Sequence, residues 1–434
     1  MKKILYKNIY LDYASATPIN KKVADLMFSH QSKFFANPSS IHKSGLEAHK
    51  VIEDARARIA SLISAHKDEI IFTGSGSESD VLAIMGVVRS FKNNAIPHIV
   101  TTVIEHPAVI EVCKMLEKNG EAEVTYVSPD ENGIINPKDI RDALKENTVL
   151  VSVMYANNEI GTVQPIMEIA KTIRHFRKNN IYGNKEAGEH GYFSPEKFLE
   201  LAPSRSLVSP ASLFPLFHTD ACQAINYLPL ENIEKLGVDL LTFNSSKIYG
   251  PKGVGVLYKK RGVTLLPLCG GGGQEFGLRS GTENTAGIAG LALAFEQTLK
   301  MKAKESDRLI KIRDYGIKKL LALSKISGYE IILNGDKVNR LPNNINISVI
   351  GISSELLVVE LDAKGIMVSA KSACKSDEPD ESYVISALRK AQGVAPNSTE
   401  GSLRISLGRQ TKKSHIDSLV RTLNDILKKY SKWK

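Results

Sequence analysis

From Leu216 to Lys247 the chain reads LFHTDACQAINYLPLENIEKLGVDLLTFNSSK. Two short apolar runs in this stretch, residues 216–219 and 239–243, are typical of strands, and each leads directly into polar residues. Asp220 follows the first run, and Lys247 lies just beyond the second. In open parallel sheets, ligands bind beyond the carboxyl ends of the strands. We therefore expect Asp220 and Lys247 to belong to one ligand site.

The alternation of strand and helix patterns extends over much of the chain. From about residue 50 to residue 260, apolar β-branched runs alternate with amphipathic stretches, which indicates an α/β fold with a mostly parallel sheet flanked by helices. Pro107 suits the first turn of one of the helices. The further elements predicted here are strands at residues 69–73, 98–104 and 148–154 and helices at residues 108–118 and 166–177.

The C-terminal third has a different pattern. A glycine-rich segment at residues 270–273 precedes a helix-rich region that begins near Thr285 and runs toward Ser324. A chain of 434 residues is long enough for two buried cores. We predict a large domain over residues 17–302 and a small α+β domain made of residues 1–16 and 303–434. The elements predicted in the latter are strands at residues 345–349, 366–369 and 403–406 and a closing helix from His415.

Residues 179–213 interrupt the pattern of the large domain with glycines, prolines and scattered charges. Connections between a helix and a strand are usually about 2 to 6 residues long. We interpret this segment as an insertion, either a surface excursion or a lid.

The composition is ordinary for a globular chain, with 42% apolar and 24% charged residues and a formal charge of +10. No membrane span is evident, the N-terminal apolar run is too short for a signal peptide, and the four cysteines lack the spacing of a metal site or a disulfide framework. These features favour the cytoplasm. Because aromatic residues do not alternate with the tail lysines, we expect a solvated face there and no direct nucleic-acid partner. The lysines concerned are Lys428, Lys429, Lys432 and Lys434.

Other predicted strands also end in residues with useful chemistry. The strand that ends at Thr73 leads into Gly76 and Ser77, where free backbone N–H groups and a hydroxyl suit a phosphate at a helix N-terminus. His106 follows the next strand, and Asn158 follows the one after it. Each of these residues alone has a simpler interpretation, as a tight connection or a capping residue.

Together, these residues are the kinds that pyridoxal 5′-phosphate requires. The cofactor needs an amine for its aldehyde, a carboxylate for its ring nitrogen, a phosphate cradle and a flat side chain against its ring. Lys247, Asp220, Gly76 with Ser77, and His106 are of these four kinds. The sequence therefore predicts a pyridoxal 5′-phosphate site at the strand ends.

A long colinear series of motifs resembles the cysteine desulfurases of the aminotransferase class V family, in the branch that serves iron-sulfur assembly and thiolation. The resemblance covers nearly the whole chain outside residues 179–213 and implies the fold-type I pyridoxal-phosphate scaffold. The matching stretches are residues 11–14, 17–18, 37–40 with His42, 72–80, 105–106, 157–161, 220–221 with Gln223, 247–253 and 279–282.

The resemblance implies a role for each matched residue around the cofactor. Lys247 corresponds to the Schiff-base lysine, Asp220 to the partner of the ring nitrogen and His106 to the residue stacked on the ring. Gln223 and Asn158 correspond to residues near the ring hydroxyl. In the family the residue that matches Thr282 reaches the phosphate from the other subunit, which implies a homodimer. The phosphate ligands implied are Gly76, Ser77, Asn244, Ser246 and Thr282.

The resemblance also implies how L-cysteine is bound and where its sulfur goes. Arg404, together with Asn158, corresponds to the residues that bind the substrate carboxylate, and a bidentate arginine suits that planar anion. Cys374 corresponds to the loop cysteine that attacks the substrate sulfur and keeps it as a persulfide while L-alanine leaves. Lys247 and His106 are the other catalytic residues implied. The persulfide acceptor is expected to be an iron-sulfur scaffold or a tRNA thiolation enzyme.

The other cysteines, Cys113, Cys222 and Cys269, occur in apolar or helical contexts and are expected to be structural.

The chain departs from the family pattern at several positions. Asn244 stands where the family usually has serine and Ser246 where it usually has histidine, and both positions contact the phosphate. If the family's histidine is charged, the loss of its contact with the phosphate would weaken cofactor binding by about 1 to 3 kcal/mol. Lys371 replaces a glycine before the reactive cysteine, and Val81 replaces an asparagine.

Two alternatives remain. One is an aminotransferase or lyase of the same scaffold, which would act on another amino acid and would not need Cys374. The other is a degenerate relative that keeps the dimer as a non-catalytic scaffold. The presence of Lys247, Asp220, His106 and Cys374 together argues against the second.

Overall fold

The computed structural model describes residues 8–93, 95–182, 214–370, 382–394 and 400–432. Cys374, Lys371 and most of the predicted insertion lie outside the described residues.

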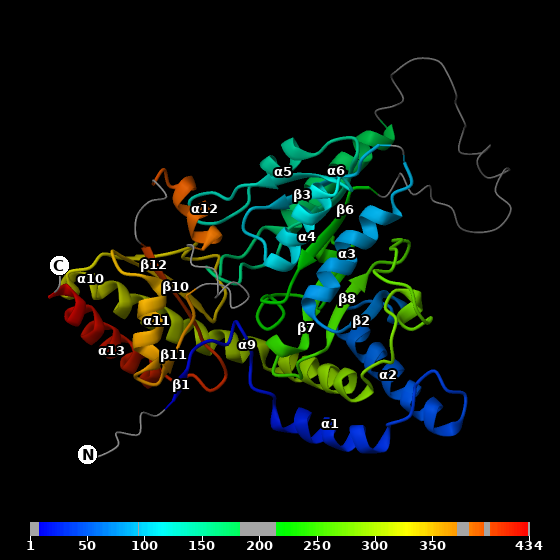
Figure 1. The fold of residues 1–434 in the computed structure, drawn as a ribbon, viewed down its shortest axis with the longest axis horizontal. Coiled ribbons are helices and arrows are strands. Elements are labelled where there is room, and N and C mark those ends of the chain that lie inside the picture. The colour runs from blue at the N-terminus through cyan, green and yellow to red at the C-terminus, as the bar shows by residue number, and fades with distance from the viewer. Residues whose placement is uncertain (1–7, 94, 183–213, 371–381, 395–399, 433–434) are drawn as a thin grey trace.

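A seven-stranded sheet forms the centre of the larger part of the structure (Figure 1). Its strand order is β2-β8-β7-β6-β5-β3-β4, and every neighbouring pair is parallel except the two that involve β8. The strands are β2 (Ile70–Thr73), β3 (His98–Thr102), β4 (Glu123–Val127), β5 (Thr148–Ser152), β6 (Leu216–Asp220), β7 (Leu240–Asn244) and β8 (Gly255–Lys259).

Helices cover both faces of this sheet, because consecutive apolar residues of the central strands point to opposite sides. Leu150 of β5 and Leu240 of β7 pack with α3 (Gly76–Ser90) and α4 (Pro107–Lys118). Their neighbours Val151 and Leu241 belong to a core on the other face, called the first core below. The helices that contribute to that core are α1 (Lys21–Lys33), α2 (Lys43–Leu62), α5 (Pro137–Ala143), α6 (Ile166–Tyr182), α8 (Ile233–Leu236), α9 (Thr285–Ala322) and α12 (Tyr383–Ala391).

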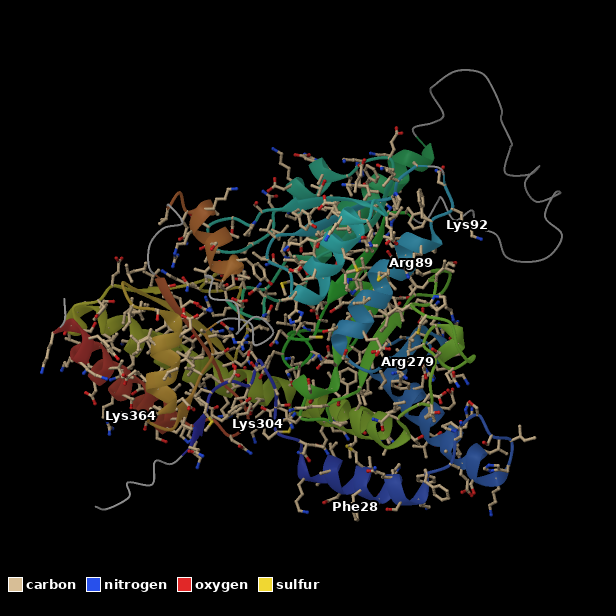
Figure 2. All side chains as sticks on the ribbon, in the orientation of Figure 1. Phe28, Arg89, Lys92, Arg279, Lys304 and Lys364 are labelled. Carbon is tan, nitrogen blue, oxygen red and sulfur yellow. The ribbon has the colours of Figure 1, made fainter. Side chains whose placement is uncertain are left out.

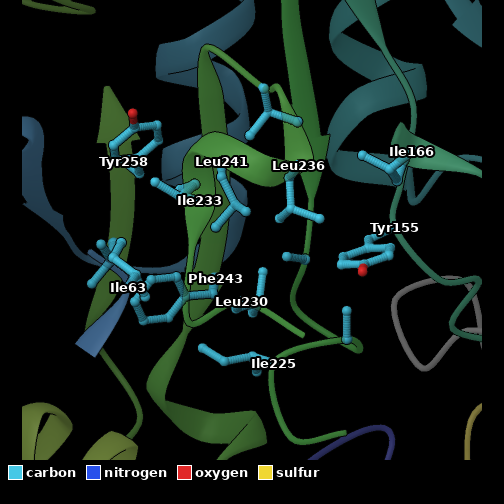
Figure 3. Close-up of a cluster of buried hydrophobic side chains, with 14 of the residues drawn as sticks. Ile63, Tyr155, Ile166, Ile225, Leu230, Ile233, Leu236, Leu241, Phe243 and Tyr258 are labelled. Carbon is cyan, nitrogen blue, oxygen red and sulfur yellow. The ribbon is translucent and has the colours of Figure 1, made fainter. Parts of the chain in front are cut away.

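Figure 3 shows part of the first core. Leu241 of β7 lies close to Ile233 and Leu236 of α8, Phe243 lies near Ile63 and Leu230, and all of these side chains are buried. This packing fixes the position of β7, whose carboxyl end leads into Lys247.

A smaller, separate core surrounds the antiparallel sheet β12-β10-β9 and the parallel pair β1-β11. The long helix α9 joins the two parts: Leu291 and Phe295 belong to the first core, whereas Leu309 and Leu320 belong to the second. The remaining elements of this part are β1 (Ile9–Tyr10), β9 (Ile331–Leu333), β10 (Asn344–Ile350), β11 (Ile366–Met367), β12 (Glu400–Ser406), α10 (Ser324–Ser327), α11 (Ser354–Asp362), α12 (Tyr383–Ala391) and α13 (Lys413–Ser431).

The predicted α/β fold class and its mostly parallel sheet are confirmed. The predicted strands at 98–104 and 148–154 extend too far, because their last residues already turn into the loops that carry the site. The helix predicted at 166–177 continues to Tyr182, so the proposed insertion begins within α6. The domain boundaries stay a prediction, and Leu388 of α12 packs in the first core although it falls in the predicted small domain.

Two strands of the sheet were missed by sequence reasoning. β4 is an edge strand with only one fully buried residue, so its apolar signal is weak. β8 follows a glycine-rich turn and runs antiparallel to both of its neighbours, which the strand-helix alternation does not predict.

None of the described helices combines the length and the apolar character that a membrane crossing needs.

Candidate active site

A cavity of about 140 Å³ lies where the carboxyl ends of β5, β6 and β7 meet the start of α3 and strand β12. It brings together residues from distant parts of the sequence. The lining residues are Ala14, Ser15, Gly76, Ser77, Asp80, His106, Met154, Asn158, Asp220, Cys222, Gln223, Asn244, Lys247 and Arg404.

Lys247 reaches this cavity from a short 3₁₀ turn directly after β7. Its Nζ donates to the carbonyl oxygens of Ala14, at 2.8 Å, and Ser15, at 2.6 Å. Gln223 donates through Nε2 to the same Ala14 carbonyl, at 3.0 Å. The N-terminal segment therefore holds the amine in place at the cavity wall.

Asp220 ends β6, and its Oδ1 accepts from the main-chain N–H of Cys222 at 2.8 Å. A second buried carboxyl group, Asp80, lines the same cavity from α3, with Oδ1 3.5 Å from Nε2 of His218. Burial and the nearby charge of Asp220 hold the pKa of Asp80 well above its usual range. Burial lowers the pKa of His218 to about 4. Both shifts favour the uncharged forms of Asp80 and His218, and β6 brings a second carboxyl group, that of Asp220, to the same cavity.

His106 is the N-cap of α4, with Pro107 in the first turn as expected. Its Nδ1 accepts from the main-chain N–H of Ala108 at 3.2 Å. Burial lowers the pKa of His106, so the ring is neutral and its proton lies on Nε2. The helix cap thus fixes the orientation of a flat, uncharged ring beside the cavity.

The preceding residue, Glu105, is fully buried. Its Oε1 accepts from the hydroxyl of Thr102 at 2.8 Å and from the main-chain N–H of Met154 at 2.9 Å. Burial raises the pKa of Glu105 to about 8, so its carboxyl group carries a proton at neutral pH. Glu105 thus connects the loop of His106 to the end of β5 as a neutral group.

The N-terminus of α3 gives the cavity a backbone surface suited to an anion. Gly76 is packed so closely that a Cβ there would lie 2.8 Å from Nδ2 of Asn244 and 2.9 Å from Sγ of Cys222. Ser77 follows it and is exposed. A larger residue at the first position of this helix would have to displace the side chains of Asn244 and Cys222.

Arg404 lines the cavity from β12 and is buried. Its Nη2 donates to Oδ1 of Asp12 at 3.0 Å and to the hydroxyl of Ser15 at 2.6 Å, and its Nη1 donates to the carbonyl of Asn158 at 3.2 Å. Within the described residues, Nε of Arg404 and Oδ1 of Asn158 are buried and have no hydrogen-bond partner. The two side chains thus keep one donor and one acceptor for a ligand.

Most of the predicted site residues line this one cavity, whereas Ser246 and Thr282 do not. Ser246 lies behind Asn244, donating from its hydroxyl to Oδ1 of Asn244 at 3.0 Å. Thr282 lines a different cavity of about 90 Å³. Cys374 lies outside the described residues.

Sequence reasoning missed Asp80 and misjudged two cysteines. Asp80 lies one helical turn after Gly76, and that spacing could have placed it on the same face of α3. Cys222, expected to be structural, lines the cavity because it follows Asp220 in the turn after β6. Cys269 is exposed rather than packed in an apolar context, whereas Cys113 is buried in α4 as expected.

The sequence model of the aminotransferase class-V family matches residues 9–181 and 215–419. The chain belongs to this family. The gap between the two matched ranges falls on the predicted insertion, so the class-V fold is continuous on either side of it.

Relatives named cysteine desulfurase IscS match nearly the whole class-V chain. The protein from Dictyoglomus turgidum is 40% identical over 98% of this chain and 95% of its own length, and one from Clostridium botulinum is 38% identical over 97% and 95%. The predicted resemblance to cysteine desulfurases is confirmed.

Solved structures agree with this assignment. A NifS-like protein superimposes with a TM-score of 0.81 at 30% identity, covering 97% of this chain and 99% of its own. A structure described as SspA in complex with cysteine superimposes with a TM-score of 0.71 at 30% identity, covering 92% and 98%.

Proposed function

We propose that this class-V protein is a pyridoxal-phosphate-dependent cysteine desulfurase that converts L-cysteine to L-alanine and keeps the sulfur as a persulfide on Cys374. The observation that carries the proposal is that Lys247, Asp220, His106 and Arg404 line one cavity. The relatives named cysteine desulfurase support the choice of substrate.

The residues of the cavity fit the cofactor. Lys247 offers an amine for the aldehyde, Asp220 a carboxylate for the ring nitrogen, and the tightly packed Gly76 a backbone approach for the phosphate. His106 and Gln223 would contact the ring. When bound, pyridoxal 5′-phosphate supplies an electron-withdrawing ring that stabilises negative charge on the bound amino acid.

The chain's own groups would then orient the reactants and move protons. Lys247 can take up and return a proton at Nζ, since the Ala14 and Ser15 carbonyls hold that atom at the cavity wall. Asp220, at the end of β6, would be the carboxylate that faces the ring nitrogen. Arg404 and Asn158 would bind the substrate carboxylate.

Cys374 would attack the sulfur of the bound cysteine. A sulfur–sulfur bond forms while the bond between carbon and sulfur breaks, and the carbon takes a proton as alanine leaves.

The described residues on either side of residues 371–381 support this role for Cys374, because both are attached beside the cavity. On one side Ser369 exchanges two main-chain hydrogen bonds with Arg404, at 3.1 and 2.7 Å. On the other, the hydroxyl of Ser382 donates to Oε2 of Glu159 at 2.5 Å, next to Asn158. Ser369 is only five residues from Cys374, a reach of up to about 17 Å for an extended chain.

A homodimer is part of the proposal, with Thr282 serving the partner's phosphate site. Thr282 lies away from the cavity of its own chain. Exposed apolar side chains nearby support an interface, since Ile41, Leu46 and Phe276 line a broad cavity of about 500 Å³ that shares Glu283 with the Thr282 cavity. Phe28 is also exposed on the outer side of α1 (Lys21–Lys33), as Figure 2 shows.

We further propose that the protein works in the cytoplasm and passes its persulfide to an acceptor protein, either an iron-sulfur scaffold or a tRNA thiolation enzyme.

Substrate profiling tests the function against the other reactions of class-V proteins. Purified protein with pyridoxal 5′-phosphate and a reductant should form alanine and sulfide from L-cysteine. It should form far less product from amino acids without a thiol. Turnover of another amino acid with none of L-cysteine would instead favour an aminotransferase or lyase.

A further inference from the structure

The loop that carries Asn158 follows β5 of the large sheet, yet its backbone is bonded mainly to the smaller part of the structure. Four consecutive carbonyl oxygens in this loop each accept a hydrogen bond from a residue between 340 and 404. The carbonyl of Asn158 accepts from Arg404 at 3.2 Å, and that of Glu159 accepts from Asn344 at 3.0 Å and from Asn346 at 3.1 Å. The carbonyl of Ile160 accepts from Arg340 at 2.8 Å, and that of Gly161 accepts from the main-chain N–H of Leu341 at 2.9 Å.

Arg340 is the centre of this arrangement. It is 4% exposed, and its Nη1 donates both to the Ile160 carbonyl and to Oδ1 of Asn344, at 3.2 Å. Its Nη2 donates to the carbonyl of Asn334, and its Nε donates to the carbonyl of Asp336 at 2.8 Å. One buried guanidinium therefore ties the loop of Asn158 to three points of the segment that leads into β10.

The loop of Asn158 packs closely against the start of β10 at Gly161. Gly161 has a φ of +76°, and a Cβ at this position would lie 2.5 Å from Cγ of Asn344. Because interiors packed this closely resist small displacements, the loop cannot shift without moving β10. On β10, Asn346 pairs in register with Arg404 of β12. The loop, β10 and β12 thus form one connected unit.

Asn158 and Arg404 are the two ends of that unit that reach the cavity. Nε of Arg404 is a buried donor without a hydrogen-bond partner in the described part of the chain. The amide of Asn158 lines the same cavity, and its Nδ2 is the group that can donate to a carboxylate. A carboxylate bound between two such side chains depends on their separation, because hydrogen bonds weaken steeply outside a narrow range of distance and angle.

We propose that Arg340, assisted by Asn344, is a positioning residue for the substrate carboxylate, holding Asn158 and Arg404 at a fixed separation in the cavity. The inference rests on the proposed function. Arg340 touches neither substrate nor cofactor, so its loss should weaken carboxylate recognition and leave the cofactor bound through Lys247.

The test compares two ligands that differ in the carboxylate alone. L-Cysteine has it, whereas cysteamine keeps the amine and the thiol but lacks it. In Arg340→Gln, KM for L-cysteine should rise about tenfold, the loss expected for roughly one good hydrogen bond. The cysteamine concentration at the midpoint of the change in cofactor absorbance should stay within about twofold of the wild-type value. The absorbance of the protein without ligand should not change.

Arg313→Gln is the matched control. Arg313 is equally buried, and it donates to the carbonyls of Arg340 and Leu341 at 3.1 Å rather than to the Asn158 loop. The control should raise KM for L-cysteine by less than about threefold. Should Arg340→Gln not fold, Asn344→Ala removes one donor to Glu159 and one acceptor of Arg340 and should give the same split between the two ligands.

Equal weakening of L-cysteine and cysteamine would overturn the inference, since it would indicate general loosening of the site. An unchanged KM in both Arg340→Gln and Asn344→Ala would overturn it as well. Neither result would affect the proposed function, which fails instead if the wild-type protein makes no alanine from L-cysteine.

Discussion

Nζ of Lys247 lies 2.6 Å from the carbonyl oxygen of Ser15, so a residue that follows β7 is bonded to a segment more than two hundred positions earlier in the chain. Ser15 also accepts from Nη2 of Arg404 through its hydroxyl, at 2.6 Å. One short N-terminal segment therefore orients both the amine proposed for the cofactor and the arginine proposed for the substrate. The predictions that follow depend on these contacts.

Lys247→Ala should abolish the visible absorbance of the protein prepared with pyridoxal 5′-phosphate, because no other amine lies among the described residues that line the cavity. Absorbance spectra of the dialysed protein measure this. Lys259→Ala is the control: Nζ of Lys259 also donates to a main-chain carbonyl, that of Val263 at 3.1 Å, but it is remote from the cavity lining. A band that persists in Lys247→Ala would refute the assignment of this lysine.

Arg404→Lys should raise KM for L-cysteine by more than about tenfold while the cofactor stays bound. Lysine keeps the charge that pairs with Asp12 but loses the planar pair of donors that suits a carboxylate. Steady-state kinetics and absorbance spectra of the same preparation separate the two effects. Arg421→Lys, an exposed change on α13, serves as control. An unaltered KM in Arg404→Lys would place the carboxylate elsewhere.

Ser246→His should tighten cofactor binding by about tenfold, since a histidine here could add one charge-assisted hydrogen bond to the phosphate. The main-chain carbonyl of Ser246 accepts from Thr17, and the substitution leaves that contact in place. Titration of the cofactor-free protein with pyridoxal 5′-phosphate gives the two dissociation constants. Equal constants would mean that Asn244 and Ser246 already bind the phosphate as well as the usual family residues.

Glu105→Gln should stabilise the protein at alkaline pH. In the wild type the pKa of Glu105 is raised to about 8 from 4.5, so between these values the folded state binds more protons than the unfolded state. Stability from this group is complete below pH 4.5 and is lost as the pH rises through 8. Glutamine mimics the protonated acid and does not ionise.

The difference in unfolding free energy should therefore be small near pH 5 and reach about 2 to 4 kcal/mol in favour of Glu105→Gln at pH 9. Urea unfolding at the two pH values measures it. If the difference in unfolding free energy between wild type and Glu105→Gln does not grow with pH, Glu105 is ionised in the folded protein.

Much of the fold and most of the cavity could be predicted from the sequence, because both depend on where strands end. Asp220, Lys247 and His106 each lie within a few residues of the end of an apolar run, and parallel strands bring such positions to one edge. Asp80 was missed because it lies inside a helix rather than at a strand end, although its spacing of one turn from Gly76 puts both residues on the same face of α3. Arg340 was missed because its role depends on the contact between the loop after β5 and the segment before β10, which no local pattern records.

The departures at Asn244 and Ser246 show the same limit. The sequence indicates that two phosphate ligands are substituted, and the structure adds that Ser246 is hydrogen-bonded to Asn244 rather than facing the cavity. The contact between Ser246 and Asn244 depends on the shape of the turn between β7 and Lys247. Matching single residues to a family pattern does not reveal that shape.

The most direct measurement is mass spectrometry of the protein after a single exposure to L-cysteine, together with a count of the alanine released. We predict one additional sulfur atom on the peptide that contains Cys374 for each alanine formed, and neither product in Cys374→Ser, which should retain the cofactor absorbance. Alanine formed at the wild-type rate by Cys374→Ser, or extra sulfur on Cys222 or Cys269 instead, would contradict the account.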